Sequence, residues 1–242
     1  YGGVLFQSVP KVMLMSAILI HKTCDALGVP PAPQRQWIEA PSYFPPQNTP
    51  IWHVPTTRVN YQTDDYGTAI WLARIDQILD RRLDRKGIIF TVSYKRRDLL
   101  LQRSRHAGIM VSHSTSDVTE MVRRFKAMPP PAVLVSPAIT SGWDFTDESC
   151  KFIIVGKIAY PDTSDPVMMA RQATDKDWSS FIAMQTIIQE TGRGTRSASD
   201  KCEVIIVDNG WRWFYPQYRK DESIWFQDRE KGSLQSVPDP LI

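Results

Sequence analysis

Two arginines and a glutamine in one short stretch are residue types that bind phosphate groups. In QETGRGTRS, the residues Gln189, Arg193 and Arg196 follow one another at i, i+4 and i+7, so in a continuous helix they would share one face. A planar guanidinium donates two hydrogen bonds to phosphate oxygens. Two glycines interrupt the stretch, which indicates a helix end or a close approach by another group. The pattern is typical of a phosphate site; a solvated helix end whose arginines complement the helix dipole is the alternative.

A second stretch, SPAITSGWDFTD, begins directly after the apolar run AVLV and carries groups suited to the same chemistry. Gly142 lets the backbone approach a phosphate, and Asp144 could hold a water or a magnesium-bound water near it. Thr140 and Ser141 add hydroxyl donors. A plain loop in which Asp144 caps a turn is the alternative. Together, on consecutive elements of one sheet, the two stretches favour nucleotide chemistry.

The elements that must position these stretches alternate between short β-branched runs and longer amphipathic segments. Apolar runs bounded by turn residues predict strands that are buried on both faces: residues 12–15, 87–92, 108–111, 132–135, 151–156 and 202–208. Helices are expected at residues 68–83, 93–104, 116–128 and 177–193. In the last helix, Phe181, Met184 and Ile188 are expected on a buried face. The alternation predicts an α/β domain with a mostly parallel sheet and helices on both faces, whose ligands sit beyond the carboxyl ends of the strands.

Two regions lie outside this alternation. Residues 29–63 are rich in proline and have no clear period, so they are expected to form a connection that carries short extended pieces. The residues after about Trp213 are expected to form a surface helix and a loose terminus.

Composition excludes several classes of protein. No apolar run in the chain of 242 residues reaches a length of about 18 residues, so no membrane span is expected. Three widely separated cysteines fit neither a disulfide framework nor a four-cysteine metal site, and they indicate a reducing compartment such as the cytosol, the nucleoid or a nucleus. The formal charge of +3 is too small to indicate nucleic-acid binding by itself. The first residues lack a basic leader and a cleavage site, and the chain is expected to be a fragment.

Four stretches resemble the motifs of one known family. KVMLMSAIL (11–19) is similar to helicase motif III, GIIFTVSY (87–94) to motif IV, ITSGWDF (139–145) to motif V and QETGRGTR (189–196) to motif VI. Over about residues 8–216, the chain therefore resembles the C-terminal RecA-like half of a superfamily 2 DNA helicase of the DinG and XPD branch. EAPSYFPPQNTPIWHVP and KIAYPDTSDPVMMAR further suggest that branch. The resemblance implies the RecA-like P-loop NTPase fold.

The resemblance implies nucleotide-binding roles for motifs V and VI. Arg193 and Arg196 would act as arginine fingers that stabilise charge on the transferring γ-phosphoryl group, and Gln189 would hydrogen-bond a phosphate or the water network around it. Gly142 and Asp144 would sense the γ-phosphate. ATP and Mg²⁺ are the implied cofactors.

Motifs IV and V also imply a set of residues near the DNA backbone: Ser93, Tyr94, Thr140 and Ser141. Tyr94 could equally be a buried anchor. Three arginines of the following helix either add to the positive field there or are merely solvated: Arg96, Arg97 and Arg103. Single-stranded DNA is the implied partner, bound with little sequence preference.

Three positions depart from the pattern of the family. Ile18 replaces the threonine that usually ends motif III, Ser141 stands where motif V usually has glutamate, and Thr195 takes a place that is usually aliphatic. The strength of coupling between the ATP and DNA sites, and the nucleic-acid preference, therefore stay open.

The chain contains no G-x-x-x-x-G-K-[ST] loop and no acidic box for magnesium, and the resemblance places both in a first RecA-like half. ATP and Mg²⁺ are therefore expected to be held mainly by an N-terminal RecA-like domain of the same protein, and this chain alone is expected to be inactive. The iron-sulfur cysteines of the branch are expected in that half too, so no cluster is expected here. The expected organisation is a motif III segment at 1–28, the proline-rich connection at 29–63, a helicase C-terminal domain at 64–216 and a tail at 217–242.

Two competing functions come from other classes. One is a RecA-like module that has lost catalysis and serves as a nucleic-acid or protein platform; the retention of Arg193, Arg196 and Asp144 argues against it. The other is a stand-alone P-loop kinase or phosphotransferase, which the missing phosphate loop argues against.

Overall fold

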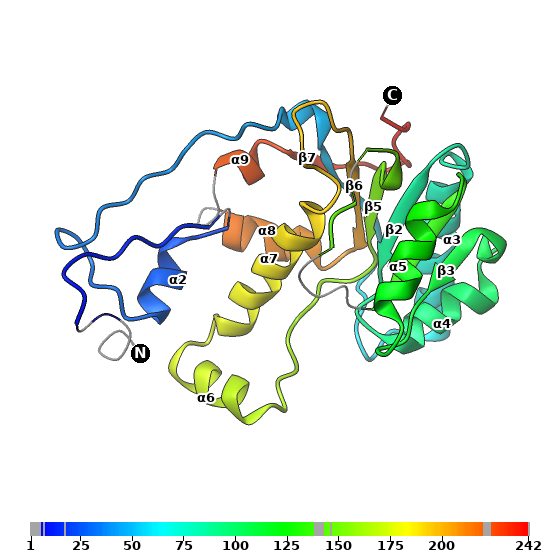
Figure 1. Cartoon of the computed structure of the whole chain (residues 1–242). Helices are drawn as coiled ribbons and strands as arrows, with labels where there is room; N and C mark the ends of the chain where they lie inside the picture. Colours follow the sequence, from blue (N-terminus) through cyan, green and yellow to red (C-terminus); the bar gives the residue numbers. More distant parts are fainter. Residues whose placement is uncertain are drawn as a thin grey trace.

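The computed structural model of the chain describes residues 6, 8–16, 18–137, 143–145, 147–219 and 224–241. At its centre lies a seven-stranded sheet in the order β3-β4-β2-β5-β6-β1-β7, in which neighbouring strands pair in parallel (Figure 1). The strands are β1 (Ile51–Thr57), β2 (Lys86–Phe90), β3 (Met110–Ser112), β4 (Ala132–Ser136), β5 (Phe152–Val155), β6 (Glu203–Asp208) and β7 (Glu230–Ser233). The predicted α/β class with a mostly parallel sheet is confirmed.

Helices cover both faces of the sheet, and α2 and α6 lie away from it (Figure 1). The helices are α2 (His21–Ala26), α3 (Asp65–Asp80), α4 (Tyr94–Arg103), α5 (Val118–Ala127), α6 (Pro166–Thr174), α7 (Trp178–Thr191), α8 (Trp211–Tyr218) and α9 (Ile224–Gln227). Side chains of α5, α7 and α8 share one buried cluster with Ile88 and Phe90 of β2, whereas those of α3 and α4 share the other with Ile89. Because successive residues of a strand point to opposite faces, one short run of β2 contributes to both cores.

Two strands come from regions whose sequence gives weak strand signals. β1 is one of the extended pieces expected in the proline-rich connection, and it lies between β6 and β7. Its register against β6 shifts between His53 and Thr57, around Pro55, which has no N–H to donate to the sheet. β7 was expected as part of a loose terminus, but it pairs with β1 at the edge of the sheet. The domain boundaries expected from the sequence stay predictions.

The C-terminal residues are held in place, so the expectation of a loose terminus is wrong. Val237 is buried, and the carbonyl oxygens of Val237 and Leu241 accept hydrogen bonds from the guanidinium groups of Arg81 and Arg85 at 3.1 and 2.7 Å. These arginines follow the end of α3 and supply donors that a hydropathy pattern does not reveal.

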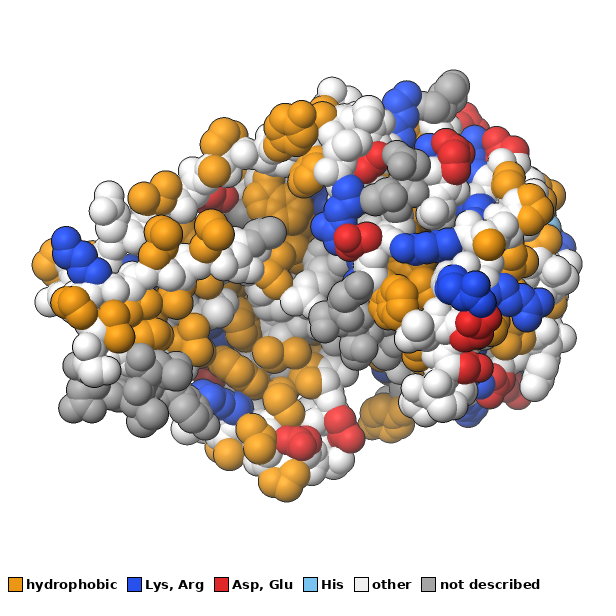
Figure 2. Space-filling model, in the orientation of Figure 1, with side chains coloured by type: hydrophobic (Ala, Val, Ile, Leu, Met, Phe, Trp, Pro, Cys, Tyr) orange, Lys and Arg blue, Asp and Glu red, His pale blue; other side chains and the backbone are white. Residues whose placement is uncertain are grey.

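The predicted strand at residues 12–15 is absent from the sheet. No strand pairs with these residues, and Met13 and Met15 are 87% and 89% exposed. Figure 2 shows hydrophobic side chains gathered over this N-terminal part of the molecule, at the left of the view. A strand needs a neighbouring strand to bond its backbone, and the described part of the chain offers these residues none. Across the same described residues, no helix combines the length and the apolar character needed to cross a membrane.

Candidate nucleotide-facing site

The stretch that carries Gln189, Arg193 and Arg196 is not one continuous helix. α7 ends at Thr191, so Arg193 and Arg196 lie beyond its end and the prediction of a shared helical face is wrong. Gly192 is the C-cap, with φ −84° and ψ −6°. The predicted apolar face of α7 is confirmed, since Phe181, Met184 and Ile188 are all buried.

Gly194 is needed for packing within the chain. A Cβ atom placed on Gly194 would lie 2.2 Å from Sγ and 2.8 Å from Cβ of Cys202, the residue just before β6. The close approach indicated by this glycine is therefore made by a core side chain. Because Cys202 precedes β6, the contact also places the arginine stretch at the amino edge of the sheet, whereas the fold rule places ligands at the carboxyl edge.

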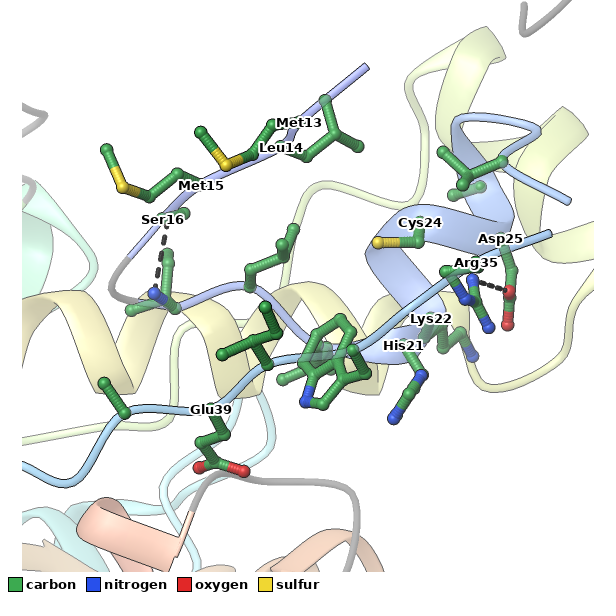
Figure 3. Close-up of a pocket in the computed structure, with 18 of the residues that line it drawn as sticks. Met13, Leu14, Met15, Ser16, His21, Lys22, Cys24, Asp25, Arg35 and Glu39 are labelled. Carbon is green, nitrogen blue, oxygen red and sulfur yellow. Dashed lines mark hydrogen bonds and ion pairs between the residues drawn. The ribbon is translucent and has the colours of Figure 1, made fainter. Parts of the chain in front are cut away.

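Gln189, Arg193 and Arg196 nevertheless line one cleft of about 2260 Å³. Its opposite wall consists of the N-terminal segment, α2 and part of the proline-rich connection, and Figure 3 shows residues of that wall, including Met13, Met15 and Glu39. Arg35 and Asp25 form an ion pair on that wall at 2.7 Å. The three polar residues therefore border one cleft although they do not share a helical face, and their roles toward a nucleotide stay predictions.

Arg193 is largely buried and is held by main-chain contacts to the second stretch. Its Nη1 donates to the carbonyl oxygen of Trp143 at 3.1 Å, and its own carbonyl oxygen accepts from the N–H of Phe145 at 3.2 Å. Burial lowers the pKa of Arg193, and the carboxyl of Glu190 opposes that shift. Burial raises the pKa of Glu190 to about 8, although the positive charge of Arg193 lowers it. Glu190 was not predicted, because it lies away from the apolar face formed by Phe181, Met184 and Ile188, and only the structure shows its burial.

Arg196 differs from Arg193 because its side chain is half exposed. Its guanidinium forms an ion pair with the carboxylate of Asp144, whose side chain is 55% exposed. The main-chain N–H groups of Arg196 and Ser197 donate to Asp200 at 2.6 and 2.7 Å, which fixes the backbone of the loop. The two predicted stretches therefore meet, and the exposed guanidinium can exchange a carboxylate for a phosphate.

A family model described as the helicase C-terminal domain matches residues 78–229, more than half of the chain. The chain belongs to the helicase C-terminal domain family. The match contains the complete arginine site. Among curated proteins, none matches the chain in sequence.

Solved helicase structures have the same fold as this helicase C-terminal domain. An apo XPD structure is 16% identical with a TM-score of 0.56, covering 75% of this chain and 39% of that chain. Xpd4 of S. tokodaii is 14% identical with a TM-score of 0.53, and the match covers 76% of this chain and 38% of that chain. S. cerevisiae Dbp5 bound to RNA and ADP BeF3 is 12% identical with a TM-score of 0.52, and the match covers 78% of this chain and 42% of that chain. At these identities the likeness shows the fold alone, and this chain spans about two fifths of the length of each of these structures.

The residues expected near nucleic acid are only partly described. Thr140, Ser141 and also Gly142 of the nucleotide set lie outside the described residues. Ser93 is the N-cap of α4, and its Oγ accepts from the N–H of Arg96 at 3.3 Å. Tyr94 is 41% exposed, which excludes the buried-anchor alternative. Its role toward nucleic acid stays a prediction.

Two of the three residues that depart from the family pattern, Ile18 and Thr195, lie among the described residues. Thr195 is buried, and its hydroxyl has no hydrogen-bond partner among the described residues, so the threonine is placed as an aliphatic side chain would be. Ile18 packs against the core cluster that includes α7. Within the described ranges, no group of three or more His, Cys, Asp or Glu side chains is arranged to hold a metal ion.

Proposed function

We propose that this chain is the second motor domain of an ATP-dependent DNA helicase that couples ATP hydrolysis to translocation along single-stranded DNA and to duplex unwinding. Its family membership supports the helicase part of this proposal. The observation that carries the nucleotide part is the convergence of Arg193, Arg196 and Asp144 beside one open cleft. In this proposal an N-terminal RecA-like domain of the same protein holds most of ATP and Mg²⁺.

The two arginines have different tasks in this proposal. Arg193 is fixed by the Trp143 carbonyl and by burial, so it supplies a rigid guanidinium that needs little reorganisation. Arg196 must release Asp144 before it can donate to a phosphate, so Asp144 holds the arginine in place until a nucleotide is bound. Gln189 is exposed at the same cleft and is suited to hydrogen-bond a phosphate or its water network. Domain closure would bring these groups to the γ-phosphoryl group.

The competing function is a RecA-like module that binds nucleic acid or protein without catalysis. Such a module has no need for a buried arginine and an exposed arginine that converge on one cleft. The two functions differ in what happens to ATP turnover when an arginine is removed.

The test is ATP turnover by the full-length protein that carries this chain. Arg196→Ala and Arg193→Ala should each lower turnover by about two orders of magnitude or more, the scale expected when a transition-state guanidinium is lost. Arg196→Lys should restore little of the ATP turnover, because the point charge of lysine does not reproduce two parallel hydrogen bonds from a guanidinium. Arg123→Ala is the matched control, since Arg123 is an exposed arginine of α5 that forms an ion pair with Glu120. Near-normal turnover in both alanine variants would refute the assignment.

A further inference from the structure

A buried arginine from the C-terminal part of the chain contacts the end of α7, just before the two site arginines. Arg229 lies between α9 and β7 and is only 5% exposed. Its Nη2 donates to the carbonyl oxygen of Thr191, the last residue of α7, at 3.0 Å, and its Nε donates to the carbonyl oxygen of Thr49 at 2.8 Å. Thr191 and Thr49 are buried as well, and Arg229 lines the same cleft as Arg193.

The charge of Arg229 suits its place at the end of α7. The last carbonyl groups of a helix have no partner within the helix, and the helix dipole puts partial negative charge there. A planar guanidinium can donate to two acceptors at once. Burial lowers the pKa of Arg229 to about 10, so the side chain still carries its positive charge at neutral pH. Because Arg193 follows Thr191 by two residues, this contact fixes the point at which the arginine turn begins.

The residue beside Thr49 holds the other end of the same turn. The side-chain amide of Asn48 donates to the carbonyl oxygen of Ala198 at 2.9 Å, two residues beyond Arg196. Asn48 and Thr49 belong to the proline-rich connection and immediately precede Pro50 and β1. Two neighbouring residues of the connection are therefore joined to the turn, at its beginning through Arg229 and at its end directly.

The position of the turn matters because a guanidinium stabilises a transition state only from a defined place. A misplacement of about 1 Å at a distance from the chemistry can cost about a hundredfold in rate. Arg193 and Arg196 lie between Thr191 and Ala198, the two points at which the turn is held. A shift of either point would move at least one of the two arginines.

We propose that Arg229 is a positioning residue for ATP hydrolysis that acts through Thr191 on Arg193, with Asn48 as the second point that holds the arginine turn. The inference rests on the proposed function, since Arg229 can affect turnover in this way only if Arg193 acts on the nucleotide. It extends that function to the proline-rich connection: a movement of the connection at residues 48 and 49 would move the arginine turn with it.

The test is steady-state ATP turnover by the full-length protein that carries this chain. Arg229→Met should lower kcat about tenfold or more and change KM for ATP less than about threefold, because the displaced guanidinium of Arg193 acts on the transition state. Arg229→Lys should recover part of the lost kcat, since a lysine ammonium can still donate to a carbonyl group at the end of α7.

Lys86→Met is the matched control for the loss of a buried cation. Lys86 is buried, and its Nζ donates to the carbonyl oxygens of Lys126 and Met128, at the end of α5, at 2.9 and 2.8 Å. Both methionine variants remove two hydrogen bonds to main-chain carbonyl groups, so both should lower the melting temperature. Only Arg229→Met should lower kcat, because Lys86 does not hold the arginine turn.

A double variant shows whether Arg229 acts through Arg193. Arg193→Ala combined with Arg229→Met should turn over ATP within about threefold of Arg193→Ala alone, because the side chain to be positioned is already absent. If the two single losses multiply in the double variant, the positioning role is overturned.

The other outcomes separate this inference from the proposed function. A parent-like kcat in Arg229→Met, or an equal loss in Lys86→Met, would overturn the positioning role and leave the proposed function standing. Near-normal turnover in both Arg193→Ala and Arg196→Ala would overturn the two together. If Arg229→Met does not fold, Asn48→Ala decides, since it removes one hydrogen bond of a half-buried side chain. This variant should lower kcat about threefold or more, and a parent-like kcat would overturn the positioning of the turn.

Discussion

Arg193 and Arg196 share a motif, but the structure gives them different energetic environments. Arg193→Ala leaves the Trp143 carbonyl without its donor and the buried Glu190 without its neighbouring charge, so it should lower the free energy of unfolding by about 1–3 kcal/mol. Arg196→Ala removes one half-exposed ion pair and should lower it by at most about 1 kcal/mol. Melting temperatures of the two purified variants measure the difference, and equal temperatures would show that burial of Arg193 contributes nothing.

At the residue scale, the sequence predicted the chemical groups of the candidate site better than their geometry. The family resemblance implied roles toward one nucleotide for Asp144 and Arg196, and the structure joins these two residues in an ion pair. The sequence did not predict that Arg193 would be buried, because burial depends on the Trp143 carbonyl and on Glu190, which contact it only after the chain folds.

At the scale of elements, we expect the two glycines of the turn after α7 to respond differently to substitution by alanine. Gly194→Ala should lower the free energy of unfolding by about 1–3 kcal/mol, because the added methyl overlaps Sγ of Cys202. Gly192→Ala is the matched control: its nearest new contact is the Ile188 carbonyl oxygen at 3.3 Å, and its backbone suits alanine. Urea denaturation of both variants measures the contrast. A Gly194 variant as stable as the control would refute the packing role of this glycine.

The hydrophobic pattern of the sequence predicted those strands and helices that are buried by their immediate neighbours. The β-branched runs that became β2, β4, β5 and β6 were all predicted, because both of their faces are apolar. The helix expected at 177–193 runs from Trp178 to Thr191, since Gly192 caps it. β7 was missed because the sequence EKGS has no apolar alternation, and only its pairing with β1 makes it a strand.

On the scale of the whole molecule, the C-terminal residues bind the end of α3 to the sheet. Deleting residues 235–242 should lower the free energy of unfolding by about 1–3 kcal/mol, because it removes buried Val237 and the carbonyl acceptors of Arg81 and Arg85. Asp239→Ala is a control that removes only an exposed ion pair with Arg81. The midpoint of urea unfolding measures both changes. An unchanged midpoint after the deletion would mean that the terminus is loose in solution.

The position of β1 has a consequence for how the chain is made. Ile51 pairs with Val204 on one side and with Glu230 on the other, so both partners of β1 are translated well after it. During synthesis β1 has two open edges until β6 and β7 have left the ribosome. Contacts between residues so distant in sequence slow folding, because a large loop must close before any pairing energy is gained. Pro55 and the polar residues of β1 make the unpaired strand a poor template for aggregation.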